Sequence, residues 1–202
     1  MPAIGITGGL STGKSSFCER LRELLPNAKF FDADRAAHEL ADLPKVKNEL
    51  RREFGDEIFS GESLNREGLR TIIFADAAKK SALEKILHPR IREQWSAQAN
   101  KHRNSSDFFF ADIPLLYETA GETLCDRVVV VACSPEIQLE NFIKRSQIDR
   151  ATAEKMIASQ MPLEEKIKRA DHVAWNNGDR NTLCEQARLL VDLWRNQKWT
   201  KA

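Results

Sequence analysis

The fold is decided by residues 4–16, which read IGITGGLSTGKSS. A short apolar run leads into Gly8-Gly9-Leu10-Ser11-Thr12-Gly13-Lys14-Ser15, and this octapeptide satisfies G-x-x-x-x-G-K-[ST] at every specified position. Apolar residues at helical spacing follow, beginning with Phe17 and Leu21. A strand, a glycine-rich turn and a helix in this order are the context in which the motif binds phosphate. The stretch therefore predicts a phosphate-binding loop.

The residue types in this loop suit a nucleoside triphosphate. Glycines let backbone N–H groups converge on phosphate oxygens, and the positive end of the following helix dipole adds to their attraction. We expect Lys14 to reach the β- and γ-phosphates and the Ser15 hydroxyl to bind Mg²⁺. The residues expected to contact ATP in this stretch are Gly9, Leu10, Ser11, Thr12, Gly13, Lys14, Ser15 and Ser16.

The composition is that of an ordinary globular protein. The chain has 202 residues, of which 42% are hydrophobic and 30% charged, and its formal net charge is +1. This balance gives no indication of binding to nucleic acid or to a membrane surface. The four cysteines show no C-x-x-C spacing, and no run approaches the about 18 apolar residues that span a bilayer. We expect a cytoplasmic protein with reduced thiols and no structural metal, in which a monomer suffices for the chemistry.

Short β-branched or aromatic runs alternate with helical patterns along the chain. Such alternation is typical of a parallel sheet with crossover helices, so we expect a five-stranded α/β core. Asp179 is the expected N-cap of a final helix that packs on the sheet through apolar residues between Leu183 and Trp194. The strands are predicted at residues 3–7, 29–31, 108–111, 128–132 and 172–175.

Two helical segments interrupt the sheet pattern. The first shows no strand signal, and a break is expected at His88-Pro89, because proline disfavours helix in the residue before it. Its helices are predicted at residues 34–41, 45–54, 66–74, 77–87 and 89–103. The second segment is dense in charge and precedes the last strand. The predicted organisation is a nucleotide-binding core of residues 1–34, 106–140 and 171–202, a helical acceptor domain of residues 35–105, and a lid of residues 141–170.

Two carboxylates, Asp32 and Asp34, follow the second predicted strand. A kinase needs a carboxylate that orients the acceptor hydroxyl and takes its proton, and either residue could supply it. Aspartate also caps helices, so one acid can serve the helix that follows. The spacing of two does not choose between them. We expect Asp34 to be catalytic and Asp32 to support it.

A third acid, Asp112, ends the apolar run Phe108-Phe109-Phe110-Ala111. A strand that ends in an acid resembles a Walker B element, whose carboxylate holds Mg²⁺ directly or through water. The alternative is a turn acid with no role at a metal. We predict Mg²⁺ contacts from Ser15 and Asp112.

The chain resembles the dephospho-coenzyme A kinases over nearly its whole length. The phosphate loop ITGGLSTGKSS, the acid-bearing FFDADRAAHEL, the turn LHPRI and the third-strand motif DIPLLYE match that family in order. The segments DRVVVVACSPEIQL, IKRS, IASQM and EEKIKRADHVAWNNG follow at approximately the family's spacing. One departure is Asn141, which stands where the family usually has an arginine three residues after Gln138.

The resemblance implies the reaction and several residue roles. The substrates would be ATP with Mg²⁺ and dephospho-coenzyme A, whose ribose 3′-hydroxyl is phosphorylated. Asp34 would be the general base, Lys14 and Ser15 would handle the triphosphate and Mg²⁺, and Arg145 would be a lid arginine on the transferring phosphoryl group. Asn177 would lie near the adenine, and the first helical segment would hold the acceptor.

Two other functions share part of this pattern. A nucleoside or nucleoside-monophosphate kinase also needs the loop, an insertion and a lid. A nucleotide switch without an acceptor needs the loop alone, and the large helical insertion argues against it. The loop after the last strand reads Asn176-Asn177-Gly178-Asp179. Its second position lacks the lysine of the guanine-binding N-K-x-D motif, which argues against a GTPase.

Overall fold

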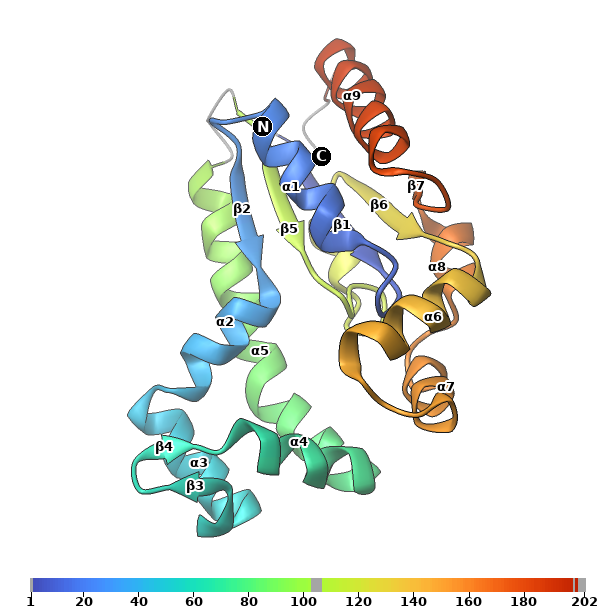
Figure 1. The fold of residues 1–202 in the computed structure, drawn as a ribbon. Coiled ribbons are helices and arrows are strands. Elements are labelled where there is room, and N and C mark those ends of the chain that lie inside the picture. Colours follow the sequence, from blue (N-terminus) through green and yellow to red (C-terminus); the bar gives the residue numbers. More distant parts are fainter. Residues whose placement is uncertain (1, 103–106, 198, 200–202) are drawn as a thin grey trace. The chain divides into compact units, whose positions relative to one another are not determined.

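The computed structural model describes residues 2–102, 107–197 and 199. A five-stranded sheet has the order β2-β5-β1-β6-β7 (Figure 1). The pairs β1–β5, β1–β6 and β6–β7 are parallel, which confirms the predicted sheet. Its strands are β1 (Ala3–Gly8), β2 (Lys29–Asp32), β5 (Phe109–Asp112), β6 (Arg127–Ala132) and β7 (His172–Trp175), each within one residue of the prediction.

The chain divides into two compact units, of which the helical one is Asp32–Gln98 and the other contains the sheet. The helices of the sheet unit are α1 (Lys14–Leu24), α6 (Pro135–Ser146), α7 (Arg150–Ala158), α8 (Leu163–Arg169) and α9 (Arg180–Asn196), with a short 3₁₀ turn η2 (Gly121–Leu124). In the apolar core of this unit, α1 and α9 pack with β1 and β6. Ile4, Val129, Phe17 and Trp194 are fully buried in this cluster, so the final helix packs on the sheet as predicted.

Local capping fixes where several of these helices begin. The Asp179 carboxylate accepts a hydrogen bond of 2.8 Å from the Thr182 amide, which confirms the predicted N-cap of α9. Ser134 caps α6, so this helix begins at Pro135 and continues to Ser146. The expected boundary between residues 140 and 141 therefore falls inside one continuous helix.

The helical unit has a core of its own, in which Val46, Leu50 and Ile58 are at most 1% exposed. It also contains a two-stranded antiparallel hairpin that the sequence did not indicate. The two strands have two residues each, which is too short for an alternating pattern, and Gly61 provides the turn with a φ of 63°. The elements are α2 (Ala33–Ala41), α3 (Pro44–Phe54), η1 (Asp56–Ile58), β3 (Phe59–Ser60), β4 (Ser63–Leu64), α4 (Arg66–Ala75) and α5 (Ala77–His102), the last continuing beyond this unit.

The predicted break at His88-Pro89 is wrong, because α5 runs through Pro89 without interruption. Proline removes one backbone donor from the helix. The Arg90 guanidinium donates to the nearby Ile86 carbonyl, and it also bonds both oxygens of Glu49 at 2.7 and 2.9 Å. Leu83 and Leu87, before this point, pack on the unit's core, and Trp95, beyond it, is 2% exposed, so burial on both sides of Pro89 outweighs the local preference. Arg103 and the expected boundary at residues 105 and 106 lie outside the described residues.

Candidate functional site

The predicted phosphate loop connects the end of β1 to the first turn of α1. Gly13 precedes that helix with a φ of 95°, in the left-handed region that glycine adopts without strain. A Cβ atom at this position would lie 2.0 Å from Asn176 Nδ2, so close packing also requires glycine. Lys14, Ser15 and Ser16 form the first turn of the helix, where unpaired amides attract an anion.

The structure brings Lys14 and Asp112 together. Asp112 is the last residue of β5 and pairs in register with Ile6 of β1, two residues before the loop begins. Its carboxylate forms an ion pair with the Lys14 ammonium, and the two side chains are 9% and 14% exposed. The Ser15 side chain is exposed beside Lys14. The predicted acid therefore lies at the phosphate loop.

Burial also shapes the chemistry of the neighbouring thiol. Cys18 is one turn along α1 and donates to Asp112 Oδ2 at 3.5 Å. Burial, reinforced by the negative charge of Asp112, raises the pKa of the Cys18 thiol far above its usual value. Cys18 is therefore a protonated hydrogen-bond donor to the acid, and all four cysteines are free.

Two amide side chains form hydrogen bonds to the backbone of the loop. Gln138 Nε2 donates to the Leu10 carbonyl at 3.0 Å, and Asn176 Nδ2 donates to the Thr12 carbonyl at 3.1 Å. Gln138 is 5% exposed and would lie 2.5 Å from a Cβ at Gly9. Sequence reasoning missed both roles, since an amide in a helix or after a strand carries no signal of the backbone that it will reach.

The predicted nucleotide contact Asn177 has its side chain engaged elsewhere. Its Oδ1 accepts a hydrogen bond of 2.7 Å from the Ser134 amide, at the beginning of α6. This hydrogen bond joins the loop after β7 to the loop after β6. The preceding residue, Asn176, is the one that contacts the phosphate loop. The backbone of Asn177 remains the group predicted to face an adenine.

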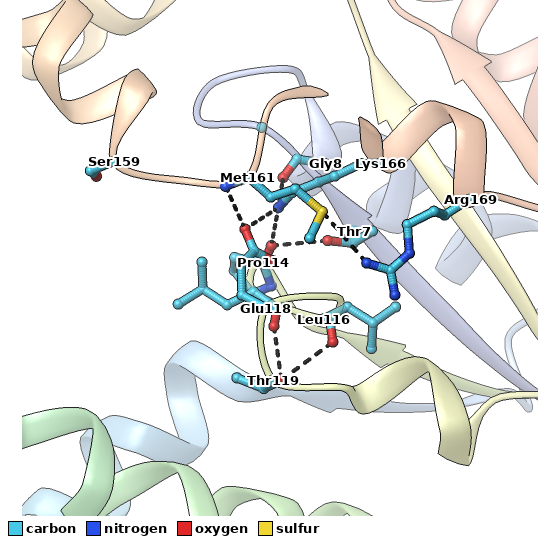
Figure 2. Close-up of polar contacts among 12 residues, drawn as sticks. Thr7, Gly8, Pro114, Leu116, Glu118, Thr119, Ser159, Met161, Lys166 and Arg169 are labelled. Carbon is cyan, nitrogen blue, oxygen red and sulfur yellow. Dashed lines mark hydrogen bonds and ion pairs between the residues drawn. The ribbon is translucent and has the colours of Figure 1, made fainter. Parts of the chain in front are cut away.

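A buried lysine, Lys166, is also part of this site (Figure 2). Its ammonium donates to the carbonyl of Gly8, the first residue of the loop motif, at 3.3 Å. Burial lowers the pKa of Lys166, the hydrogen bond that it donates to Glu118 opposes this shift, and the charge of Lys14 lowers the pKa further. Two lysines therefore lie at the phosphate loop, and the sequence motif contains only the first.

The remaining predicted residues lie on helices or, in the case of Asp32, at the N-cap of one. Arg145 is an exposed residue in the last turn of α6, with its guanidinium carbon 5.9 Å from the centre of the Phe142 ring. In the helical unit, Asp32 caps α2 by accepting from the Arg35 amide at 2.9 Å, and Asp34 is exposed in the first turn of that helix. One of the two acids thus has the capping role that their spacing left open.

Within the part of the chain that the structure describes, three or more His, Cys, Asp or Glu side chains nowhere gather as a metal site would require. Over the same residues, no helix combines the length and the apolar character needed to cross a membrane. A phosphate loop between β1 and α1, with its lysine paired to the acid that ends the neighbouring strand, defines the class of P-loop nucleotide-binding α/β proteins.

Comparison with known proteins narrows this class. A family model described as dephospho-CoA kinase matches residues 2–182. A Bacillus cereus protein named dephospho-CoA kinase is 37% identical over 194 residues, which cover 95% of this chain and 96% of that protein. The solved structure of a dephospho-CoA kinase from Campylobacter jejuni has a TM-score of 0.66 at 26% identity, over 95% of this chain and 96% of the other. A solved Thermus thermophilus protein has a TM-score of 0.79 at 29% identity, over 98% of each chain. This chain belongs to the dephospho-CoA kinase family and is a phosphotransferase.

Proposed function

We propose that this protein transfers the γ-phosphate of ATP to the 3′-hydroxyl of the ribose of dephospho-coenzyme A, which yields coenzyme A and ADP. The observation that carries the proposal is the phosphate loop with its Lys14–Asp112 pair, in a chain that matches this family over residues 2–182. Phosphoryl transfer needs positioning and charge neutralisation more than covalent chemistry by the protein. The loop amides and Lys14 would neutralise charge on the β- and γ-phosphates, and Arg145 would stabilise the transferring group.

Mg²⁺ fits the oxygen donors that this site offers. A carboxylate at Asp112 and a hydroxyl at Ser15 are hard ligands of the kind that Mg²⁺ prefers, and Mg²⁺ commonly takes only one or two protein ligands beside phosphate oxygens. The ion would supply positive charge to the triphosphate. Asp112 is paired with Lys14 in the present structure, so binding of a Mg²⁺-nucleotide would exchange that partner for the ion and release Lys14 to the phosphates.

Asp34 is proposed as the base that takes the proton of the acceptor hydroxyl. Asp32 has its carboxylate engaged with the Arg35 amide, while Asp34 is exposed in the same turn of α2. The match of FFDADRAAHEL to the acid-bearing segment of the family supports the assignment of the catalytic role to Asp34.

The domain roles belong to the same proposal. Residues 35–105 would bind the acceptor, because the helical unit has a core of its own and can therefore keep a binding surface in shape. Residues 141–170 would form the lid that excludes water during transfer. A cytoplasmic monomer that needs neither nucleic acid nor a membrane is sufficient for this reaction.

The proposal is tested by identifying products. Purified protein is incubated with ATP and Mg²⁺ and, separately, with dephospho-coenzyme A, AMP, a nucleoside or no acceptor, and the products are identified by mass. The expected result is 3′-phosphorylated product from dephospho-coenzyme A that disappears when a chelator removes the metal. A faster reaction with AMP or a nucleoside would favour a nucleoside or nucleotide kinase, and hydrolysis that ignores every acceptor would favour a nucleotide switch.

A further inference from the structure

Among the residues that the structure describes, Lys166 is the one charged residue that is fully buried, at 0% exposure. It lies in α8, where the local sequence EEKIKR reads as a solvated helix face. Its neighbour two positions later, Lys168, shows that pattern: it is exposed and pairs with Glu165 at 2.7 Å. Burial of a lysine is costly unless its charge and all its donors are satisfied.

The ammonium of Lys166 has an acceptor for each of its three protons (Figure 2). It donates to the Gly8 carbonyl at 3.3 Å, to the Pro114 carbonyl at 2.9 Å and to Glu118 Oε1 at 2.9 Å. Glu118 supplies the opposite charge. The site is therefore complete without water or a further ligand.

These acceptors belong to the two segments that carry the paired Lys14 and Asp112. Gly8 ends β1 and begins the phosphate loop, and Pro114 comes two residues after Asp112. The Pro114 carbonyl also accepts from Thr7 Oγ1 at 2.9 Å, which adds a second bond between the same segments. Lys166 thus joins the start of the loop to the chain that follows the acid.

The same cluster fastens the charged segment around α8. Glu118 Oε1 accepts a further hydrogen bond of 3.0 Å from the Met161 amide, just before this helix. At the other end of α8, Arg169 pairs with Glu122, and its guanidinium carbon lies 4.4 Å from the centre of the Tyr117 ring. The segment after β5 is thereby bound to both ends of α8, with Lys166 between them.

We propose that Lys166 is a positioning residue for nucleotide binding, which holds the Gly8 end of the phosphate loop in the shape that receives the triphosphate. The ammonium does not itself need to touch the nucleotide. It fixes a backbone carbonyl whose orientation sets that of the amides that follow, and it ties this carbonyl to the segment bearing Asp112. The proposal deepens the proposed function and rests on it for the identity of the substrates.

The test separates positioning from stability with two variants and a control. Lys166→Met keeps the length of the side chain and removes the donors, but it also leaves the Glu118 charge without its ammonium partner. Lys166→Met combined with Glu118→Gln removes that buried charge as well. Lys168→Met makes the same chemical change on the exposed side of the same helix. For each protein we would measure the thermal midpoint, the Kd of MgADP, and kcat and KM for ATP and for dephospho-coenzyme A.

Lys166→Met is expected to melt at a lower temperature than the parent, and the double variant to recover most of that loss. Both should bind MgADP about tenfold more weakly and show an ATP KM raised by about tenfold, as expected for the loss of one or two hydrogen bonds. The KM for dephospho-coenzyme A should stay within about twofold of the parent's, because the contacts described for Lys166 are with the phosphate loop and the segment after β5 and not with residues 35–105, which are proposed to bind the acceptor. Lys168→Met should match the parent in every measurement.

Three results would overturn the proposal. One is a double variant in which nucleotide affinity recovers together with stability, since Lys166 would then act on folding alone. Another is an equal rise in KM for both substrates, and the third is failure of both Lys166 variants to fold, which would make the role purely structural. Weakened MgADP binding in a protein whose parent form phosphorylates no dephospho-coenzyme A would support Lys166 and refute the proposed function.

Discussion

The ammonium of Lys14 and the carboxylate of Asp112 form an ion pair between residues that are 98 positions apart in the sequence. Lys14 belongs to the phosphate-loop motif and Asp112 to the end of the third strand in the core sheet, so neither motif contains the other residue. The parallel pairing of β1 with β5 brings the two together. Since both side chains are largely buried, each is the main compensation for the other's charge. The pair therefore links nucleotide binding to the stability of the core.

Substitution of Lys14 should affect both properties. We expect Lys14→Met to abolish transfer and to lower the free energy of unfolding by about 3 kcal/mol, because it leaves a buried carboxylate unpaired. Lys14→Met with Asp112→Asn should recover most of the stability and none of the activity. Chemical denaturation and product analysis measure the two effects. Arg150→Met, which breaks an exposed pair with Glu154, is the control and should cost at most about 1 kcal/mol. An active Lys14→Met protein would contradict the assignment.

Substitutions of Asp32 and of Asp34 should differ in their effects on the kinetics and on the stability of the protein. Asp34→Asn is expected to lower kcat by about 10²–10⁴-fold with little change in ATP affinity, as for loss of a general base. Asp32→Ala removes the cap of α2 and should cost about 1 kcal/mol of stability, whereas Asp32→Asn retains a capping oxygen and should cost less. Steady-state kinetics and denaturation test both. A fully active Asp34→Asn would transfer the role of base to Asp32.

Gly13→Ala should damage the loop more than an alanine at another left-handed glycine does. At Gly13 the added methyl would meet Asn176 at 2.0 Å, whereas a Cβ at Gly61 has nothing within 4 Å. Both residues have positive φ, of 95° and 63°, so the matched variant Gly61→Ala reproduces the backbone strain without the clash. We expect Gly13→Ala to cost about 1–3 kcal/mol and to weaken MgADP binding, and Gly61→Ala to leave binding unchanged. Equal nucleotide affinity in the two variants would show that the contact with Asn176 is dispensable.

The stability of the protein should fall as the pH is lowered from about 6.5 toward 5. His172 has a buried Nε2 without a hydrogen-bond partner and a ring centre 6.0 Å from that of Trp194. Burial lowers its pKa, with Asp171 opposing the shift and Arg127 adding to it. Below the unfolded pKa the unfolded chain therefore binds a proton that the folded chain does not, and unfolding becomes easier. One such group contributes at most about 1.4 kcal/mol per pH unit.

Denaturation across this pH range gives the slope, and His172→Phe should reduce it. Burial also lowers the pKa of His88, so a second substitution, His88→Gln, should remove a further part. A slope that is unchanged in the double variant would contradict the assignment to these two histidines.

Local pattern predicted most elements and failed where packing overrode it. The strands and the phosphate loop followed from short runs whose signals are local, namely apolar residues and glycine spacing. At Pro89 the local rule was wrong, because Leu83 and Leu87 before it pack on the core of the helical unit and Trp95 beyond it is also buried, so one helix is held on both sides of the proline. The β3–β4 hairpin is too short for periodicity to reveal it.

The sequence by itself determined the phosphate loop, the parallel sheet beneath it and the family, since each depends on residue types at short spacing or on motifs in a fixed order. Only the tertiary structure decided which polar side chains hold that loop. Gln138, Asn176 and Lys166 lie far from it along the chain, and their bonds reach backbone carbonyls, which every residue has. Because every residue has a backbone carbonyl, the sequence does not show which carbonyl a lysine will contact. A buried lysine in α8 therefore cannot be told from an exposed one until the fold is known.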